Sequence, residues 1–175
     1  QALPLAGDYS LTPPPPKNPK DKQKAGTYIF KASYKDRGSA SQSPLEREDA
    51  IALRPAFQQA EQADSMSKNI RTYRPFNGDT VVLNELKSNS YFLFKHIDLT
   101  GVHSIAVGIG LSDGKYQYGG GRIEVHLNSP KGELIGKATL PQKEATAKME
   151  FMEVNMPLTG TTAGDFQDVY FVVKN

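Results

Sequence analysis

The sequence predicts an all-β protein built as a sandwich or barrel of short strands. Runs of β-branched and aromatic residues recur along the chain, and turns rich in Gly, Asn, Ser and Pro separate them. Strands at this spacing are typical of β-sandwiches and barrels. No alternation of strand and helix patterns is visible, which argues against a parallel α/β sheet.

Composition excludes several classes of site and partner. The chain has no cysteine, which rules out disulfides, thiol nucleophiles and Cys-based metal sites. Its 21 basic and 19 acidic residues leave a net charge of +2, so we expect neither nucleic acid nor an anionic membrane as a partner. No apolar run has the roughly 18 residues of a spanning helix, so we expect no membrane insertion.

The N-terminal residues 1–25 predict a linker. They contain four consecutive prolines at Pro13–Pro16, followed by a lysine-rich run without hydrophobic period. This composition is typical of an extended polyproline II spacer. A ligand for a proline-binding domain is the alternative, and the spacer is the interpretation we favour.

Residues 26–55 predict a strand-bearing extension that packs on the main domain or links to it. A strand rich in aromatic residues is expected over 27–34, and a polar loop rich in Gly and Ser over 35–48. A short strand then begins at Ile51 and ends before Pro55.

Residues 56–175 predict the main β-domain. Its first stretch, 57–66, favours a helix by composition and a strand by alternation, and both stay open. Further strands are expected at 80–83, 91–94, 104–109, 149–156 and 169–173.

A hairpin entered through three glycines lies at the centre of this domain. Apolar and polar side chains alternate over residues 122–127, so one face is expected in the core and the other in water. The residues of the water-facing set are Arg122, Glu124 and His126. Turn-forming residues fill 128–132, and a second apolar run follows them.

Four segments, in order, resemble family 6 carbohydrate-binding modules. Residues 120–136 resemble their motif GG-x-I-E-V-R-L-D-S-P-x-G-x-L-I-G, and Gln59-Ala60-Glu61 resembles their opening E/Q-A-E. Residues 94–101 resemble Y-x-x-V-D-L-T-G, and 168–174 resemble H-D-L-Y-L-V-F-K. The resemblance implies a jelly-roll β-sandwich that binds a glycan by aromatic stacking and hydrogen bonds, and that commonly holds a structural calcium ion.

An upstream segment, 26–38, resembles G-T-Y-x-x-x-A-S-Y-T-D-x-G, which precedes such a module in large secreted bacterial proteins. In those proteins it lies behind sugar-dehydrogenase-like and cytochrome c domains. This resemblance implies that the chain is a C-terminal piece of a longer protein, that it works in the periplasm or outside the cell, and that it has neighbouring domains as partners.

Candidate sugar-binding residues are Tyr116, Tyr118, Tyr91 and Lys148. Tyr116 and Tyr118 share one side of an extended loop segment and could form a platform for a sugar ring, or cover the end of the sandwich instead. Tyr91 aligns near an aromatic position of the family and belongs either to the site or to the core. Lys148 stands where the family has a Trp, and the strand at 81–83 lacks the family's Tyr.

Candidate calcium ligands are Gln59, Glu61 and Asp168. Gln59 and Glu61 are expected on one strand face, from which two oxygens can reach one ion. A solvated carboxylate is the alternative for Glu61. No other metal site is indicated, because the three histidines are scattered along the chain.

The sequence therefore predicts a non-catalytic module that binds a polysaccharide. The departures from the family leave a second reading open, a structural module that has lost sugar binding and packs on neighbouring domains. We expect no enzyme, because no pair of carboxylates shows a pattern that would bring it together for glycoside hydrolysis.

Overall fold

The computed structural model describes residues 28–74, 80–111, 120–142, 150–160 and 166–174. Within these ranges the regular structure is eleven β-strands and one short 3-10 turn at Ala60–Gln62. The predicted linker lies outside the described residues. No helix in the described ranges has both the length and the apolar character to cross a membrane.

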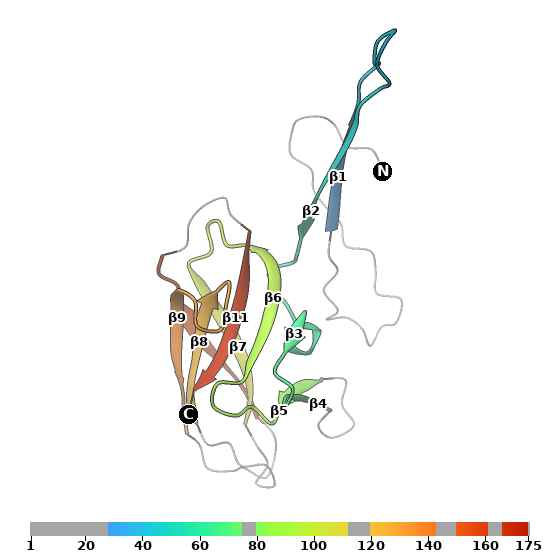
Figure 1. Ribbon diagram of the computed structural model, residues 1–175. Coiled ribbons are helices and arrows are strands. Elements are labelled where there is room, and N and C mark those ends of the chain that lie inside the picture. The colour runs from blue at the N-terminus through green and yellow to red at the C-terminus, as the bar shows by residue number, and fades with distance from the viewer. Residues whose placement is uncertain (1–27, 75–79, 112–119, 143–149, 161–165, 175) are drawn as a thin grey trace.

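The larger layer of the fold is a five-stranded antiparallel sheet (Figure 1). Its strands, in order across the sheet, are β3 (Ser65–Met66), β6 (Tyr91–Asp98), β11 (Phe166–Lys174), β8 (Gly121–Leu127) and β9 (Leu134–Leu140). The last strand, β11, lies between β6 and β8, so residues far apart in the sequence are neighbours in the sheet. This order is that of a jelly-roll sandwich and differs from a simple meander.

The facing layer consists of β7 (Ser104–Leu111) and β10 (Glu150–Pro157), which pair with each other. A separate pair, β4 (Arg71–Tyr73) and β5 (Val82–Asn84), extends the domain. Beyond the end of β10, Leu158 forms a bridge with Gly136 of β9, which joins the two layers along one edge.

One hydrophobic core lies between these layers. Val125 and Ile135 of the large sheet and Met156 of β10 have 0% exposed surface. Aliphatic residues of β7, including Val107, pack against them. Close packing of both inner faces is what stabilises a sandwich of this kind.

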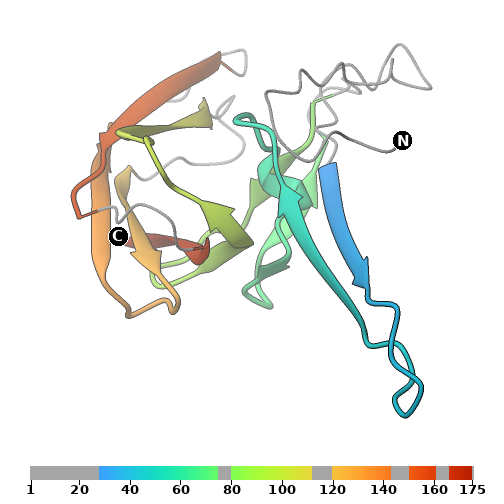
Figure 2. The same cartoon turned by 90° about the horizontal axis from the view of Figure 1, so that it is seen from above.

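A two-stranded ribbon precedes the sandwich. β1 (Tyr28–Lys35) and β2 (Glu46–Leu53) pair along their full length, and Figures 1 and 2 show this ribbon extending away from the sandwich. A two-stranded ribbon has little stability of its own, so it depends on its attachment. Arg54 forms two contacts with the Asp64 carboxylate, at 2.8 and 2.7 Å, and Asp64 also accepts the Lys95 N–H at 2.7 Å.

The predicted strands are confirmed, with three corrections. The loop predicted over 35–48 is too long, because β2 begins at Glu46 and pairs with the end of β1. The stretch 57–66 is neither a full helix nor a full strand, since it contains a 3-10 turn and the two residues of β3. The short strand β4 was not predicted from the sequence.

Candidate functional site

The strands of the large sheet present a second face, which points away from the core. We call it the outer sheet face. Its central residues are Tyr91 and Leu93 of β6, Tyr170, Val172 and Lys174 of β11, and Arg122, Glu124 and His126 of β8. They alternate with the core residues of the same strands, as expected for the pleat of a sheet.

Strand register fixes which of these residues are neighbours. Val172 lies opposite Tyr91 on one side and opposite Glu124 on the other. One pair further along β11, Tyr170 lies opposite His126. Residues opposite one another on adjacent strands share a face, so two aromatic rings and a charged cluster lie side by side.

Tyr91 and Tyr170 form a ring pair on the outer sheet face. Their centroids are 5.4 Å apart and their planes are tilted by 56°. Leu93 and Val172 beside them are only 3% and 1% exposed although they point away from the core. Burial raises the pKa of the Tyr170 hydroxyl, and the charge of Asp168 raises it further, so this hydroxyl is a hydrogen-bond donor at neutral pH.

Glu124 is the centre of the charged cluster. Its Oε1 lies 2.8 Å from a guanidinium nitrogen of Arg122, and its Oε2 lies 3.2 Å from Nε2 of His126. The Lys174 ammonium lies 4.0 Å from Oε2 and also donates to Oδ1 of Asn89 at 2.7 Å. One carboxylate therefore lies among three basic side chains.

The ionisation of Glu124 follows from this setting. Burial alone would raise its pKa, whereas the hydrogen bond from His126 and the positive charges of Arg122 and Lys174 lower it. The lowering effects together outweigh burial, so the pKa lies below its ordinary value of 4.5. Glu124 is consequently a carboxylate at neutral pH.

His126 and Glu124 differ from the sequence prediction. Both were expected in water, yet they are 9% and 8% exposed, and only Arg122 of the three is exposed. Nδ1 of His126 lies 2.9 Å from the Gly132 carbonyl oxygen, and its Nε2 faces Glu124. The prediction was wrong for these two residues because side chains from neighbouring strands and the hairpin turn cover them.

The sequence-predicted sugar-binding residues have different outcomes. Tyr116, Tyr118 and Lys148 lie outside the described residues. Tyr91 lies on the outer sheet face, half-buried and outside the core cluster, and its role as a sugar contact stays a prediction. Tyr170 was missed. The signal that would have found it is its alternation with two apolar core residues in the last strand.

The candidate calcium ligands lie in two places, Gln59 and Glu61 at the 3-10 turn and Asp168 on β11. Glu61 lies in the 3-10 turn and Gln59 precedes it, so the shared strand face expected for them was wrong. Oε2 of Glu61 is buried and has no hydrogen-bond partner, which is costly for a carboxylate and fits a bound cation. Asp168 lies at the bulge of β11, where its Oδ1 accepts the His96 N–H at 3.1 Å. In the part of the chain that the structure describes, no three His, Asp or Glu side chains gather as a metal-binding group.

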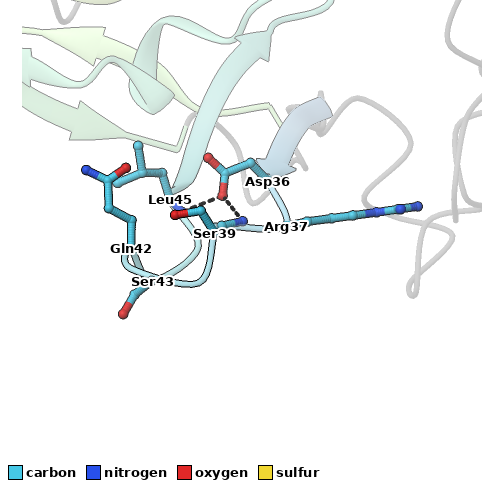
Figure 3. Close-up of a pocket in the computed structure, with 7 residues that line it drawn as sticks. Asp36, Arg37, Ser39, Gln42, Ser43 and Leu45 are labelled. Carbon is cyan, nitrogen blue, oxygen red and sulfur yellow. Dashed lines mark hydrogen bonds between the residues drawn. The ribbon is translucent and has the colours of Figure 1, made fainter.

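A cavity of about 520 Å³ lies at the tip of the ribbon (Figure 3). Oδ1 of Asp36 accepts the N–H groups of Gly38 and Leu45 at 2.8 and 2.9 Å, and this closes the loop. Gly38 has φ +64°, and a Cβ there would lie 2.6 Å from the Gln42 carbonyl oxygen. Asp36 is thus engaged in holding its own loop, while Arg37 extends away from it in Figure 3. We assign no ligand to this cavity.

No protein-family model and no curated protein sequence matches the chain. Solved structures do match it. A family 6 carbohydrate-binding module from Bacillus halodurans, described as binding β-1,3-glucan, is 26% identical over 67% of this chain and 82% of that one, with a TM-score of 0.53.

Two further modules of this family match at lower identity. One, from Clostridium stercorarium in complex with cellobiose, is 22% identical over 69% of this chain and 86% of its own, with a TM-score of 0.53. The other, from Clostridium cellulolyticum in complex with xylose, is 23% identical over 69% and 87%, with a TM-score of 0.54. The chain therefore has the β-sandwich fold of a family 6 carbohydrate-binding module.

Proposed function

We propose that the chain is a non-catalytic carbohydrate-binding module and that it holds a glycan on its outer sheet face. The observation that carries this proposal is the Tyr91–Tyr170 ring pair beside the Glu124 cluster. A sugar ring has a C–H face that gains from contact with an aromatic ring, and hydroxyls that need fixed polar partners. The β-1,3-glucan, cellobiose and xylose ligands of the similar modules support the class of ligand.

The state of Glu124 supports binding over hydrolysis. A glycosidase needs one carboxylic acid that is still protonated near neutral pH, and its pKa is raised for that purpose. The pKa of Glu124 is shifted in the opposite direction by His126, Arg122 and Lys174. Glu124 thus holds Arg122 in position by their ion pair, and Arg122 is exposed enough to donate hydrogen bonds to sugar hydroxyls.

The test is titration of the intact chain with cellotetraose, xylotetraose and a soluble β-1,3-glucan oligosaccharide. We expect at least one of these glycans to bind, and Tyr91→Ala or Tyr170→Ala to weaken its binding roughly threefold to tenfold, as loss of one ring contact predicts. Calorimetry gives the affinity and the stoichiometry.

Tyr34→Ala is the matched control, because Tyr34 is an exposed tyrosine on the ribbon, away from the outer sheet face. Its affinity should equal that of the unmodified chain. Equal affinities in all three tyrosine variants would contradict the assignment of the site, and no binding to any glycan would contradict the function.

We also propose that Glu61 contributes to a calcium site that stabilises the sandwich, with Gln59 and Asp168 as candidate partners. The support is the unpartnered buried Oε2 of Glu61. Calcium should raise the melting temperature of the chain, and a chelator should reverse this. Glu61→Gln should remove the response, whereas Glu133→Gln, an exposed carboxylate of the central hairpin, should retain it. A melting temperature that is indifferent to calcium would contradict the site.

A second candidate function is docking on neighbouring domains of a longer secreted bacterial protein, in the periplasm or outside the cell. The observation that favours it is the ribbon, on which Ile29, Tyr34 and Leu45 are 65%, 69% and 74% exposed. Large apolar side chains exposed on a projecting element favour a protein contact. Protection of these residues from hydrogen exchange or labelling in the full-length protein, relative to the isolated chain, would support docking. Equal exposure in both would contradict it.

A further inference from the structure

A second cavity, of about 430 Å³, lies between the ribbon and the sandwich. We call it the ribbon cavity. Its walls are Phe30, Lys31 and Ala32 of β1, Asp49, Ala50 and Ile51 of β2, His96 of β6 and Phe166 of β11. Its size falls in the range of about 300–1,000 Å³ that is usual for small-ligand sites.

The ribbon contributes an apolar wall and one carboxylate. Phe30 lies opposite Ile51, and Ala32 lies opposite Asp49, so these four side chains share one face of the ribbon. Lys31 points to the other face, where its ammonium lies 2.7 Å from Glu48. The ribbon thus offers the cavity a ring and an aliphatic side chain next to an acidic group.

The sandwich contributes a stack of two flat rings. The His96 and Phe166 centroids are 4.6 Å apart, with an angle of 11° between the planes. His96 has φ +57°, a backbone conformation that is unfavourable for a residue with a side chain. Asp168 holds this conformation by accepting the His96 N–H at 3.1 Å. The stack is therefore fixed in place by the sheet.

The two walls are held together at the base of the ribbon. The double contact between Arg54 and Asp64 fixes the residue that follows β2, and Asp64 accepts the backbone N–H of Lys95, directly before His96. Both contacts come from one guanidinium nitrogen of Arg54, and charge-assisted hydrogen bonds are stronger than neutral ones. The shape of the cavity thus follows from residues adjacent to its walls.

We propose that the ribbon cavity is a second sugar-binding site, which takes one pyranose unit of the glycan. Three rings, Phe30, His96 and Phe166, border it and suit the C–H face of a sugar. Among the described residues, the Asp49 carboxylate accepts only the N–H of Ala50, at 2.9 Å, and so has acceptor capacity left for sugar hydroxyls. This site rests on the proposed glycan-binding function and adds the extension of residues 26–55 to it.

The experiment compares pairs of neighbouring residues on opposite faces of the ribbon. Asp49→Ala and Phe30→Ala remove groups from the cavity, whereas Glu48→Ala and Ile29→Ala change the opposite face. Each variant is titrated with the glycan that binds the unmodified chain best, and the His96 ring signals are followed by NMR. The same titrations are repeated in a Tyr91→Ala background, which weakens the outer sheet face.

We expect the glycan to shift the His96 signals and to bind weakly to the Tyr91→Ala chain. Asp49→Ala should reduce that remaining binding at least threefold, and Glu48→Ala should leave it unchanged. Phe30→Ala should reduce it likewise, and Ile29→Ala should leave it unchanged. Asp49 lies at the surface of an exposed strand, so its variant keeps the fold even if Phe30→Ala does not.

Two outcomes would overturn the proposal in different ways. If the cavity variants bind with the affinity and stoichiometry of the unmodified chain while Tyr91→Ala weakens binding, the ribbon cavity is no sugar site and the proposed function remains. Equal losses in Asp49→Ala and Glu48→Ala would also overturn it, since they would report a general effect on the ribbon. If the unmodified chain binds no glycan, the proposed function fails and the second site fails with it.

Discussion

Glu124 and His126 occupy the outward positions of β8, and yet they are among the most covered polar side chains of the described residues. A buried carboxylate is costly unless charges and hydrogen bonds compensate its lost hydration. Arg122 and Lys174 provide the charges, and His126 provides the hydrogen bond. The outer sheet face is therefore a preorganised set of polar groups, which is what a binding site requires.

The first prediction concerns the acid sensitivity of Glu124. Its folded pKa lies below the value of the unfolded chain, so its contribution to stability is present above about pH 4.5 and is lost as the pH falls through the folded pKa. Glu124→Gln should lower the free energy of unfolding at pH 7 by on the order of 1–3 kcal/mol. It should also flatten the fall of stability between about pH 6 and pH 3.

Chemical denaturation across this pH range measures the effect, and Glu48→Gln is the control. Glu48 is an exposed carboxylate whose ion pair with Lys31 lies on the ribbon. Exposed ion pairs contribute little to the free energy of unfolding, so the pH profile of Glu48→Gln should follow that of the unmodified chain. Parallel profiles for Glu124→Gln and the unmodified chain would show that Glu124 is not held ionised by the fold.

For single residues, the sequence predicts which face of a strand a side chain lies on, but not how much of that side chain is covered. Alternation along β8 correctly separates Glu124 and His126 from the core residues beside them. Their covering depends on Lys174, which lies on β11 some fifty positions away in the chain, and on the Gly132 carbonyl. Cross-strand neighbours of this kind follow from register, which local periodicity does not encode. Alternation along the last strand would have placed Tyr170 on the outer face, whereas its pairing with Tyr91 follows from register.

At the scale of elements, the turn between β8 and β9 links the fold to the site. Asn128 has φ +61°, and its N–H donates to the Asp168 carbonyl at 2.7 Å, while its side chain accepts the Asp168 N–H at 3.1 Å. The Gly132 N–H donates to the Ser129 carbonyl at 3.0 Å, and the Gly132 carbonyl oxygen lies 2.9 Å from Nδ1 of His126. The turn thus positions the Gly132 carbonyl oxygen against His126, which belongs to the Glu124 cluster.

The second prediction follows from the space around Gly132. A Cβ on this residue would clash with the backbone carbonyl of Leu127, and backbone cannot move aside cheaply. Gly132→Ala should therefore shift the turn, lower the free energy of unfolding by about 2 kcal/mol, and change the NMR signals of His126. Lys131→Ala, at an exposed position of the same turn, should do neither. If a folded Gly132→Ala chain has unchanged His126 signals, the turn does not position His126, and the prediction is contradicted.

The positions of most strands were predictable, and the exceptions have physical causes. The central hairpin was predicted correctly because alternation and turn-forming residues agree there. The stretch 57–66 was ambiguous because its composition and its alternation point to different elements, and contacts with β6 decide the outcome. Ser65 and Met66 pair with Leu93 and Phe92, and this pairing ends the 3-10 turn that precedes them.

At the scale of the whole molecule, the sandwich and the ribbon are stabilised by different means. The sandwich encloses a core in which Ile135 and Met156 are fully buried, whereas nearly every residue of the ribbon is exposed or half-buried. The order of strands in the large sheet was not predictable from local patterns, since it places β11 between β6 and β8. The sequence resemblance to family 6 modules predicted the sandwich. The shape of the ribbon and of its cavity was visible only in the structure.

The last prediction concerns the attachment of the ribbon. Arg54→Ala removes the double contact with Asp64 and leaves Asp64 its hydrogen bond from Lys95, so the sandwich should keep its fold. We expect faster hydrogen exchange over β1 and β2, because a two-stranded ribbon without its anchor opens more often. The exchange rates of β8 and β11 should not change, since the core is untouched. Arg47→Ala, at an exposed position near the start of β2, is the control and should leave the exchange of the ribbon as it is. If Arg54→Ala gives the same exchange rates as Arg47→Ala, the Arg54–Asp64 contact does not hold the ribbon, and the ribbon cavity must owe its shape to the packing of Phe30 and Ile51 near His96 and Phe166.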